Sequence, residues 1–355
     1  MNERLNYLDI AEQRSHEGQF QVQLDIPPDS SLSSSDIERI LRISSWDGDI
    51  NTQIDGVEGQ RSVLITKDEH RHDRDIQLKG LQISGVGYKP SPIISDATPL
   101  VPPHAGNFFD LEVGQRIQAT TGMKAGKFVK ETAAYAPTGA YGMEEWERKV
   151  KSTSTARKLS TSFYTPPIEA YGQYTDLQHD GENLRFLVFS IPDVNLRRFN
   201  PQFAHDFVDM PDYTGEVAME HFAHVGTLLG KSARELHQNR FVHRQLHLGN
   251  FYYLKEQDNL FIMDWATMKP VSGSRRERAM LQMIDLVIPH QGFEYVTNEL
   301  NPDFDYDTRA MLNIPTFHAL LNGYGQCAIN QTIDFYIDLE DGKYQSLVDW
   351  VSKQS

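Results

Sequence analysis

The sequence predicts an α+β protein with a strand-rich part followed by a mostly helical part. Short runs of continuous or alternating apolar residues fill the first half, and the nearly continuous apolar run at 184–191 predicts a buried strand. In the second half, apolar residues recur every three or four positions, most clearly over 214–239. A chain of 355 residues that is 39% hydrophobic can bury a large core in two lobes.

Taken in order, the chain is predicted to have three parts. Residues 1–58 form an N-terminal extension, with a strand in 19–26 and a short helix over 36–43 capped by Ser34 or Ser35. Residues 59–192 form a strand-rich lobe with an irregular insertion near 89–135. Residues 193–355 form a helical lobe whose long first helix leads directly into a polar loop.

Composition restricts the partners and the compartment. The net charge of −15 argues against a nucleic-acid partner, because a polyanion would meet no general positive surface. The single cysteine, Cys327, excludes an intrachain disulfide and a cysteine-based zinc site. No apolar run has membrane-spanning length, and the first residues lack the apolar core of a signal peptide. We therefore expect a cytoplasmic protein without a membrane partner, although secretion without a signal peptide stays open.

The chemistry concentrates in Phe241-Val-His-Arg-Gln-Leu-His-Leu-Gly-Asn250 and in Leu260-Phe-Ile-Met-Asp-Trp265. A short strand, a polar turn and a second apolar strand are predicted between Asn250 and Asp264. These two residues would then precede and follow one hairpin, whose two chain ends lie close together. Hard cations prefer oxygen ligands, so the pair can converge on one Mg²⁺.

This segment resembles the catalytic segment of the protein-kinase-like superfamily, especially its aminoglycoside- and choline-kinase branch. There, His-Gly/Arg-Asp-x-His-x-x-Asn precedes an Asp that follows an apolar strand. The resemblance extends over roughly 60–290, with 241–265 as its specific part. It implies a bilobal kinase-like fold, ATP and Mg²⁺ as cofactors, and Asn250 and Asp264 as metal ligands.

The same resemblance places His243, Gln245 and His247 in the catalytic loop. Gln245 stands where the family has its catalytic-base Asp, and a neutral amide cannot accept a hydroxyl proton. His247 is the nearest substitute base, although the family often has a structural His at this position. Asp285 resembles the buried Asp that packs under the catalytic loop.

A second resemblance concerns the lysine expected to contact phosphate. Asp75-Ile-Gln-Leu-Lys-Gly80 is similar to the lysine-bearing strand of selenoprotein O-type kinase-like proteins, which implies this role for Lys79. Gly85 and Gly87 would belong to the loop that follows. A rival assignment takes 121–126 as the glycine-rich loop and Lys130 as the phosphate lysine, and we rank Lys79 first.

In the family, the next helix supplies a Glu that pairs with this lysine and orients it. The resembling proteins have an aromatic residue directly after that Glu. Glu145, which precedes Trp146, is therefore the first candidate, and Glu147 is the second.

The implied function is an atypical ATP·Mg-binding protein that transfers AMP or phosphate to a protein substrate without the usual Asp base. Selenoprotein O-like proteins also lack this base and are associated with adenylyl transfer to protein hydroxyls. The alternative is an inactive pseudokinase that acts as a protein-interaction scaffold. A small-molecule kinase with a substitute base is a further hypothesis. The first two functions imply a protein substrate or a binding partner.

Overall fold

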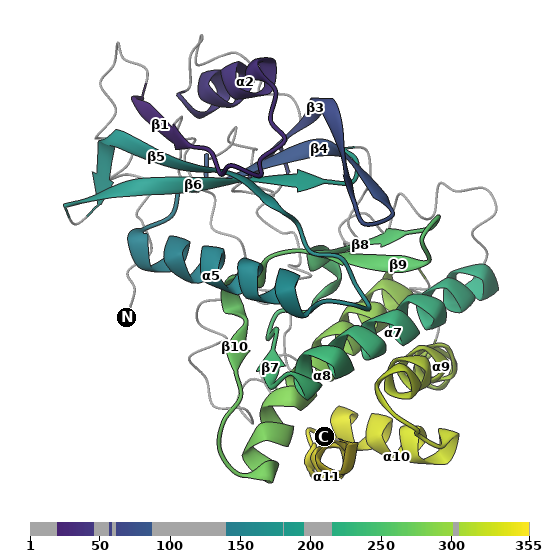
Figure 1. Ribbon diagram of the computed structural model, residues 1–355. Coiled ribbons are helices and arrows are strands. Elements are labelled where there is room, and N and C mark those ends of the chain that lie inside the picture. The colour runs from purple at the N-terminus through teal and green to yellow at the C-terminus, as the bar shows by residue number, and fades with distance from the viewer. Residues whose placement is uncertain are drawn as a thin grey trace. The chain divides into compact units, whose positions relative to one another are not determined.

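The computed structural model describes residues 20–45, 57–58, 62–86, 140–179, 181–194, 215–300 and 305–354 (Figure 1). Gly87, Lys130 and the predicted insertion near 89–135 lie outside these residues. The chain divides into two compact units. The first comprises Met1–Ser95, Phe128–Ser154 and Pro166–Leu196, and the second comprises Asp96–Lys127, Thr155–Thr165 and Arg197–Ser355.

The first unit is built on an antiparallel six-stranded sheet with the order β1-β5-β6-β4-β3-β2. Its strands are β1 (Val22–Asp25), β2 (Val57–Glu58), β3 (Ser62–Asp73), β4 (Ile76–Ser84), β5 (Ile168–His179) and β6 (Glu182–Ile191). The central strand β6 carries the apolar run Leu-Val-Phe and is buried over most of its length, as its sequence predicts. Because β1 pairs with β5, residues 22–25 are an integral part of this sheet.

Two helices cover the two faces of the sheet. Leu81 pairs with Ser190 and Ile83 with Val188, and paired residues point to the same side. Leu81, Ile83 and Val188 pack in one cluster with Ile40 of α2 (Ser34–Ser44), so this side is called the α2 face.

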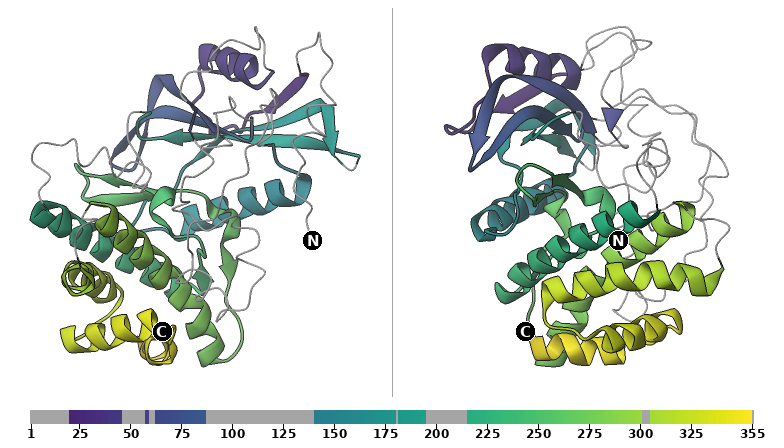
Figure 2. Two further views of the ribbon diagram at one scale, coloured as in Figure 1. Left: turned by 180° about the vertical axis from the view of Figure 1, so that it is seen from behind. Right: turned by 90° about the vertical axis from the view of Figure 1, so that its right-hand side faces the viewer.

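The opposite side, called the α5 face, carries α5 (Met143–Leu159). There Trp146 packs edge-on against Tyr171, with 5.7 Å between ring centroids. The views of Figures 1 and 2 agree in placing α2 and α5 on opposite sides of the sheet.

The cap of α2 is Ser33, one residue before the first of the two predicted caps. The Ser33 hydroxyl accepts from the backbone N–H of Asp36, and the Asp36 carboxylate accepts from the backbone N–H of Ser33. This reciprocal capping box satisfies two backbone donors at once, which neither Ser34 nor Ser35 achieves.

The second unit contains the end of α5 and the remaining helices and hairpins. The helices are α7 (Gly215–Gln238), α8 (Arg275–Leu300), α9 (Tyr306–Tyr324), α10 (Ile329–Glu340) and α11 (Gln345–Gln354). The short strands are β7 (Phe241–Val242), β8 (Phe251–Leu254), β9 (Asn259–Ile262) and β10 (Lys269–Pro270), with 3-10 turns η2 (Leu248–Asn250) and η3 (Trp265–Thr267). β8 pairs with β9, and β7 pairs with β10.

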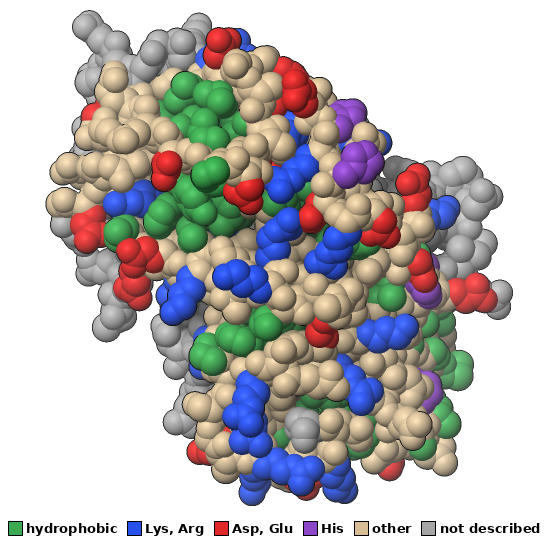
Figure 3. Space-filling view, viewed as in Figure 1, with side chains coloured by type: hydrophobic (Ala, Val, Ile, Leu, Met, Phe, Trp, Pro, Cys, Tyr) green, Lys and Arg blue, Asp and Glu red, His purple; other side chains and the backbone are tan. Residues whose placement is uncertain are grey.

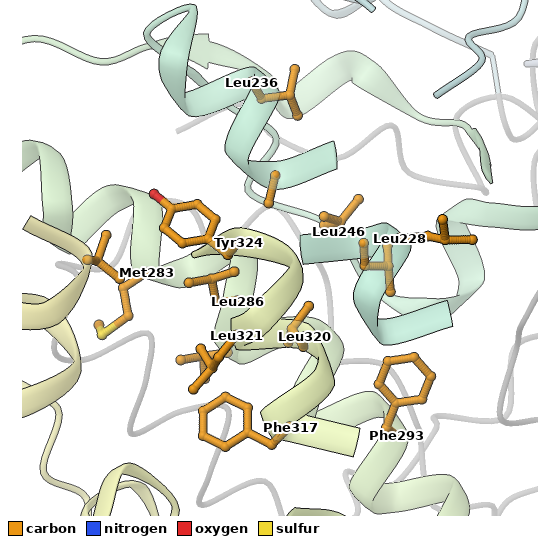
Figure 4. Packing of buried hydrophobic residues seen from close by; sticks show 14 of the residues in the cluster. Leu228, Leu236, Leu246, Met283, Leu286, Phe293, Phe317, Leu320, Leu321 and Tyr324 are labelled. Atoms are coloured by element: carbon orange, nitrogen blue, oxygen red, sulfur yellow. The ribbon is translucent and has the colours of Figure 1, made fainter. Parts of the chain in front are cut away.

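The core of the second unit lies between α7, α8 and α9. Figure 4 shows Leu228 of α7 and Leu320 of α9 in one cluster with Leu246, which belongs to the loop after β7. α7 and α9 approach closely at glycines, since a Cβ added at Gly230 would lie 2.1 Å from the Leu320 carbonyl oxygen. The loop that carries the motif residues is therefore packed onto a dense helical base.

The predicted α+β fold class is confirmed, because the large sheet belongs to one unit and most helices belong to the other. The order of elements is kinase-like, with a strand pair, a helix and two further strands ahead of a long helix, a polar loop and a hairpin. The domain boundaries at 58 and 192 stay predictions. Within the described residues, no helix is both long and apolar enough to cross a membrane.

Candidate functional site

One carboxylate holds the loop between β7 and η2. Asp285 of α8 is fully buried and accepts from the backbone N–H groups of His243 (2.7 Å) and Arg244 (2.6 Å). Arg244 has φ 71°, in the left-handed region that most residues avoid. The two charge-assisted bonds from Asp285 offset this strain and fix the start of the loop. This is the place under the loop that the resemblance implied for Asp285.

His237 extends this anchor into the helical core. Its Nε2 lies 3.1 Å from Asp285 Oδ2, and its Nδ1 lies 2.9 Å from the Tyr324 hydroxyl. Two helices, α7 and α9, therefore support the carboxylate that holds the loop. His237 is 4% exposed, a buried position that the sequence analysis did not predict. The available signal was its place one residue before the end of the helix that enters the loop.

His243 has a structural role in this loop. Its Nε2 lies 3.1 Å from the Met263 carbonyl oxygen, and its Nδ1 accepts from the backbone N–H of Gln245 at 3.3 Å. A carbonyl oxygen only accepts, so Nε2 carries the ring proton. Burial lowers the pKa of His243 despite the opposing effects of Asp285 and the Met263 carbonyl. Both ring nitrogens of a neutral imidazole are thus occupied by the backbone.

Gln245 is held by its backbone. Its N–H donates to His243, and its carbonyl oxygen accepts from Asn250 Nδ2 at 2.9 Å. The side-chain amide is left as a neutral donor and acceptor at the position where the resembling family has its base. An amide can position a hydroxyl but cannot take its proton.

His247 caps the 3-10 turn η2, and its Nδ1 accepts from the backbone N–H of Gly249 at 3.1 Å. In the neutral ring the proton is then on Nε2, so neither nitrogen offers a lone pair to a substrate while this cap is formed. This geometry weighs against His247 as the substitute base.

Asn250 and Asp264 lie at the same end of the β8–β9 hairpin. Phe251 pairs with Ile262, and beyond that pair the backbone N–H of Met263 donates to the Asn250 carbonyl at 2.7 Å. Because Asn250 Nδ2 donates to Gln245, its Oδ1 is the end of the amide left for a ligand.

Asp264 has φ 52° and ψ 61° and precedes η3, but its side chain does not cap that turn. Asp is one of the residues that tolerate the left-handed backbone conformation, and such conformations are frequent at functional sites.

The donor set of these two residues fits Mg²⁺. This ion is usually held by one or two protein side chains, with phosphates and water completing its shell. An amide oxygen and a carboxylate are suitable side-chain ligands. Elsewhere in the described residues, no three His, Cys, Asp or Glu side chains form a group that could hold a metal ion.

The structure does not bring Lys79 and Glu145 together. Lys79 precedes Leu81 and Ile83 by an even number of positions on β4, and its N–H donates to the Pro192 carbonyl at 3.0 Å. Strand side chains alternate, so Lys79 belongs to the α2 face. Glu145 belongs to α5, on the other face. Alternation along β4 therefore argues against pairing Lys79 with Glu145, and the roles of both residues stay predictions.

The α2 face contains a buried lysine–glutamate pair that the sequence did not predict. Lys67 Nζ of β3 lies 3.5 Å from Glu169 Oε1 of β5, and both side chains are fully buried. Burial favours a raised pKa for Glu169, but hydrogen bonds from Ser190 and Ser31 and the charge of Lys67 bring it below its usual value. The cluster ties the segment before α2 to the sheet. In the sequence, the signal for this pair was the single acidic residue Glu169 between the apolar residues Ile168 and Ala170.

The other predicted residues have simpler surroundings. Gly85 follows β4 with φ 105°, and a Cβ there would lie 2.8 Å from the Tyr141 ring, so a glycine is required by the turn itself. Glu145 is partly buried on α5, whereas Glu147 is exposed. Ligand roles for these residues stay predictions.

Comparison with known proteins adds little. No protein-family model matches the sequence, and no curated protein matches it. A divergent kinase of Toxoplasma that lacks the glycine-rich loop is similar at 13% identity and a TM-score of 0.28, over 56% of this chain and 68% of that one. A glucosamine kinase is similar at 10% identity and a TM-score of 0.36, over 96% and 83%. At these TM-scores neither likeness carries weight, so the kinase-like interpretation rests on this chain's own order of elements and loop geometry.

Proposed function

We propose that this protein binds ATP together with Mg²⁺ and transfers AMP or phosphate to a protein substrate without an aspartate base. The observation that carries the proposal is the position of Asn250 and Asp264 at one end of the β8–β9 hairpin, with the Asn250 amide oriented by Gln245. Asp285 supports it, because a buried carboxylate is used to hold this loop in one conformation.

The chain's own residues would divide the work in two. Asn250 and Asp264 would hold Mg²⁺, which neutralises phosphate charge when bound. Gln245 would orient the acceptor hydroxyl through its amide. Phosphoryl-group chemistry depends mostly on positioning and charge neutralisation, so loss of the base need not abolish transfer.

Adenylyl transfer is the version that the resemblance of residues 75–80 to selenoprotein O-like proteins favours. Those proteins also lack the base. The protein substrate and the preference for AMP over phosphate belong to the proposal.

A second candidate function is a pseudokinase scaffold, which a specific observation favours. Three loop residues were candidates for the catalytic base. Gln245 is neutral, and both ring nitrogens of His243 are hydrogen-bonded to the backbone. The His247 ring caps η2. None is arranged to accept a proton, and a scaffold needs no such group.

Incubation with ATP labelled at either the α- or the γ-phosphate tests the transfer. We expect label on protein from one of the two and its loss in Asp264→Ala. Asp258→Ala, at the exposed turn of the same hairpin, is the matched control and should label normally. α-Label on protein identifies adenylyl transfer, and γ-label identifies phosphoryl transfer. ATP binding without transfer of either label would contradict the transferase and leave the pseudokinase.

A further inference from the structure

Exposed apolar side chains concentrate on two neighbouring helices of the second unit. The described residues include five large hydrophobic side chains that are exposed, and four of these five belong to α9 and α10. The four are Tyr306 (56%), Met311 (69%), Ile329 (46%) and Ile337 (51%). Single exposed apolar residues are ordinary on a protein surface, whereas a group of them gathered in one place marks an interaction site.

α10 carries two apolar stripes, and only one of them belongs to the core. Phe335 and Leu339 are buried in the helical core of the second unit. Ile329, Ile333 and Ile337 recur every four residues and so share another side of the helix, where the first and last are exposed and Ile333 is half-buried. A helix rises 1.5 Å per residue, so these three residues, called the isoleucine strip, extend over about 12 Å.

α9 adds Met311 to the same region. Four residues connect α9 to α10, and the two helices lie beside each other. His318 Nδ1 of α9 lies 2.9 Å from the Thr332 hydroxyl of α10. Met311 precedes His318 by seven residues, or two turns, and therefore shares its side of α9. Because the helices are antiparallel, Met311 is level with the last turns of α10, where Ile337 lies. Methionine is frequent at binding surfaces because its flexible side chain adapts to a partner.

Carboxylates border these apolar side chains. α10 contains Asp334, Asp338 and Glu340 but no Lys or Arg. Asp334 precedes Ile337 by three residues and Glu340 follows it by three, a spacing at which helix side chains are neighbours. Burial and the charge of Asp341 raise the pKa of Glu340, so this part of the surface is dominated by negative charge.

The chemistry of this surface favours one kind of occupant. The isoleucine strip gains free energy when it is covered by apolar side chains, and the carboxylates beside it favour Lys or Arg in the covering segment. Lys343, which follows α10, pairs with Asp341 at 2.8 Å in an exposed ion pair. A second copy bound through the same surface would bring two acidic faces together, each on a chain of net charge −15.

We propose that α9 and α10 dock an amphipathic helix of a partner protein, with apolar residues on one side and Lys or Arg beside them. The docking surface consists of Met311, the isoleucine strip, Asp334 and Glu340. Helices of this kind place apolar anchors every three or four residues, which matches the spacing of the strip. The inference goes beyond the proposed function and is independent of it, because all these residues belong to α9 and α10.

Designed peptides test the docking surface directly. The probe is a fluorescent helical peptide of about five turns, with Leu at positions i, i+4 and i+8 of one side and Lys on the flanks. One control peptide has Glu in place of Lys, and another has the same composition in scrambled order. We expect fluorescence anisotropy at physiological salt to show binding of the ordered Leu-Lys peptide and much weaker binding of both control peptides.

Variants of the protein locate the binding. Ile337→Ser and Met311→Ser should each weaken peptide binding roughly tenfold, the effect of removing one apolar side chain from an interface. Ile26→Ser, at an exposed apolar residue of the first unit, is the matched control and should bind as wild type does. Asp334→Lys should also weaken binding, whereas Glu220→Lys, an equal charge change on α7, should not. If one of the two serine variants does not fold, the other decides.

Four results would overturn the inference. They are no binding of the ordered Leu-Lys peptide, equal binding of the scrambled peptide, unchanged affinity in the serine variants, or an equal loss in Ile26→Ser. Sedimentation of the wild type provides a further test, because a dimer that is lost in Ile337→Ser would make a second copy the occupant and contradict a basic partner. None of these results bears on the response of the protein to ATP, which tests the proposed function separately.

Discussion

Asp285 is the side chain on which the geometry of the candidate loop depends most. Its carboxylate accepts hydrogen bonds from two backbone N–H groups of the loop and contacts the His237 ring. The Asp285 residue is fully buried. A carboxylate is suited to this place because it only accepts, and each charged hydrogen bond is worth more than a neutral one. Asp285 thus positions Asn250 and Asp264 indirectly, through the backbone of the loop.

Asp285→Asn should destabilise the protein by roughly 3 kcal/mol, because an amide nitrogen would face a backbone N–H group in the buried site. Urea denaturation measures the change. Asp334→Asn removes an exposed carboxylate from α10 and is the control. Equal unfolding midpoints for the two variants would show that Asp285 does not anchor the loop.

Glu294 of α8 is a second residue with an unusual setting. Its Oε1 accepts from the Tyr336 hydroxyl at 2.8 Å and from Asn313 Nδ2 at 3.4 Å. Burial and the nearby carboxylate of Glu340 raise the pKa of Glu294 to about 7, although the two hydrogen bonds oppose this. The Glu294 carboxyl group therefore loses its proton near neutral pH while it is packed among α8, α9 and α10.

The sign of the resulting pH dependence follows from linkage. Between 4.5 and about 7 the folded protein holds a proton that the unfolded chain has lost, so the Glu294 contribution to stability falls as pH rises through this window. The loss is at most about 3 kcal/mol for a shift of this size. Glu294→Gln should remove it and be more stable than wild type at pH 8, with a smaller advantage at pH 5.

Free energies of unfolding in urea across pH 5 to 8 check this prediction. The exposed Glu220→Gln on α7 is the matched control and should follow the wild-type pH profile. If wild type and Glu294→Gln change with pH in parallel, Glu294 does not titrate in this range.

At the scale of elements, the contact between α7 and α9 is the tightest constraint on the helical unit. A Cβ at Gly230 would lie 2.1 Å from the Leu320 carbonyl oxygen, and a Cβ at Gly323 would lie 2.1 Å from that of Thr227. Both obstacles are helix backbone, which cannot rotate away as a side chain can. The α7 end that enters the loop is positioned by this contact.

Gly230→Ala should therefore destabilise the protein by roughly 3 kcal/mol, at the upper end of the usual cost of overpacking, although alanine favours helices. Gly142→Ala meets nothing within 4 Å and is the matched control. Thermal unfolding of both variants measures the difference. A Gly230→Ala protein that melts with the control would contradict the close helix contact.

Periodicity predicted the elements whose packing it reflects. The expected helix over 214–239 is α7 (Gly215–Gln238), and the apolar run at 184–191 lies within β6. Two helices contain an internal proline, which ordinarily ends or kinks a helix. α8 continues through Pro289 to Leu300, and α9 continues through Pro315, because buried residues on both sides of each proline hold the helix together.

The candidate site, too, could be predicted from the sequence only in part. The spacing of Asn250 and Asp264 around an apolar hairpin was sufficient to predict their proximity, since a hairpin brings its ends together. Lys79 shows what sequence cannot supply. Alternation groups Lys79 with Leu81, but only the packing of α2 and α5 decides which face each helix covers. The buried position of His237 depended on the same tertiary information.

At the scale of the whole molecule, charge is unevenly distributed despite the net value of −15. Figure 3 shows Lys and Arg side chains gathered over the beginning of α8 and over α11. Arg275 there donates to the Ser352 carbonyl and Arg276 to the Gln345 amide oxygen, which joins the two helices. These arginines contribute to the fold of the second unit. The absence of a nucleic-acid partner stays a prediction.

The central claim is that Asn250 and Asp264 form a metal-dependent nucleotide site, and thermal melting tests it most directly. Wild type, Asp264→Ala and the hairpin control Asp258→Ala would be melted with ATP, with and without Mg²⁺. A ligand at a hundred times its Kd adds about 2.7 kcal/mol to folded-state stability, which is readily measured. We expect a Mg²⁺-dependent rise in melting temperature in wild type and in Asp258→Ala that is absent in Asp264→Ala. No rise in wild type, or an equal rise in Asp264→Ala, would contradict the account.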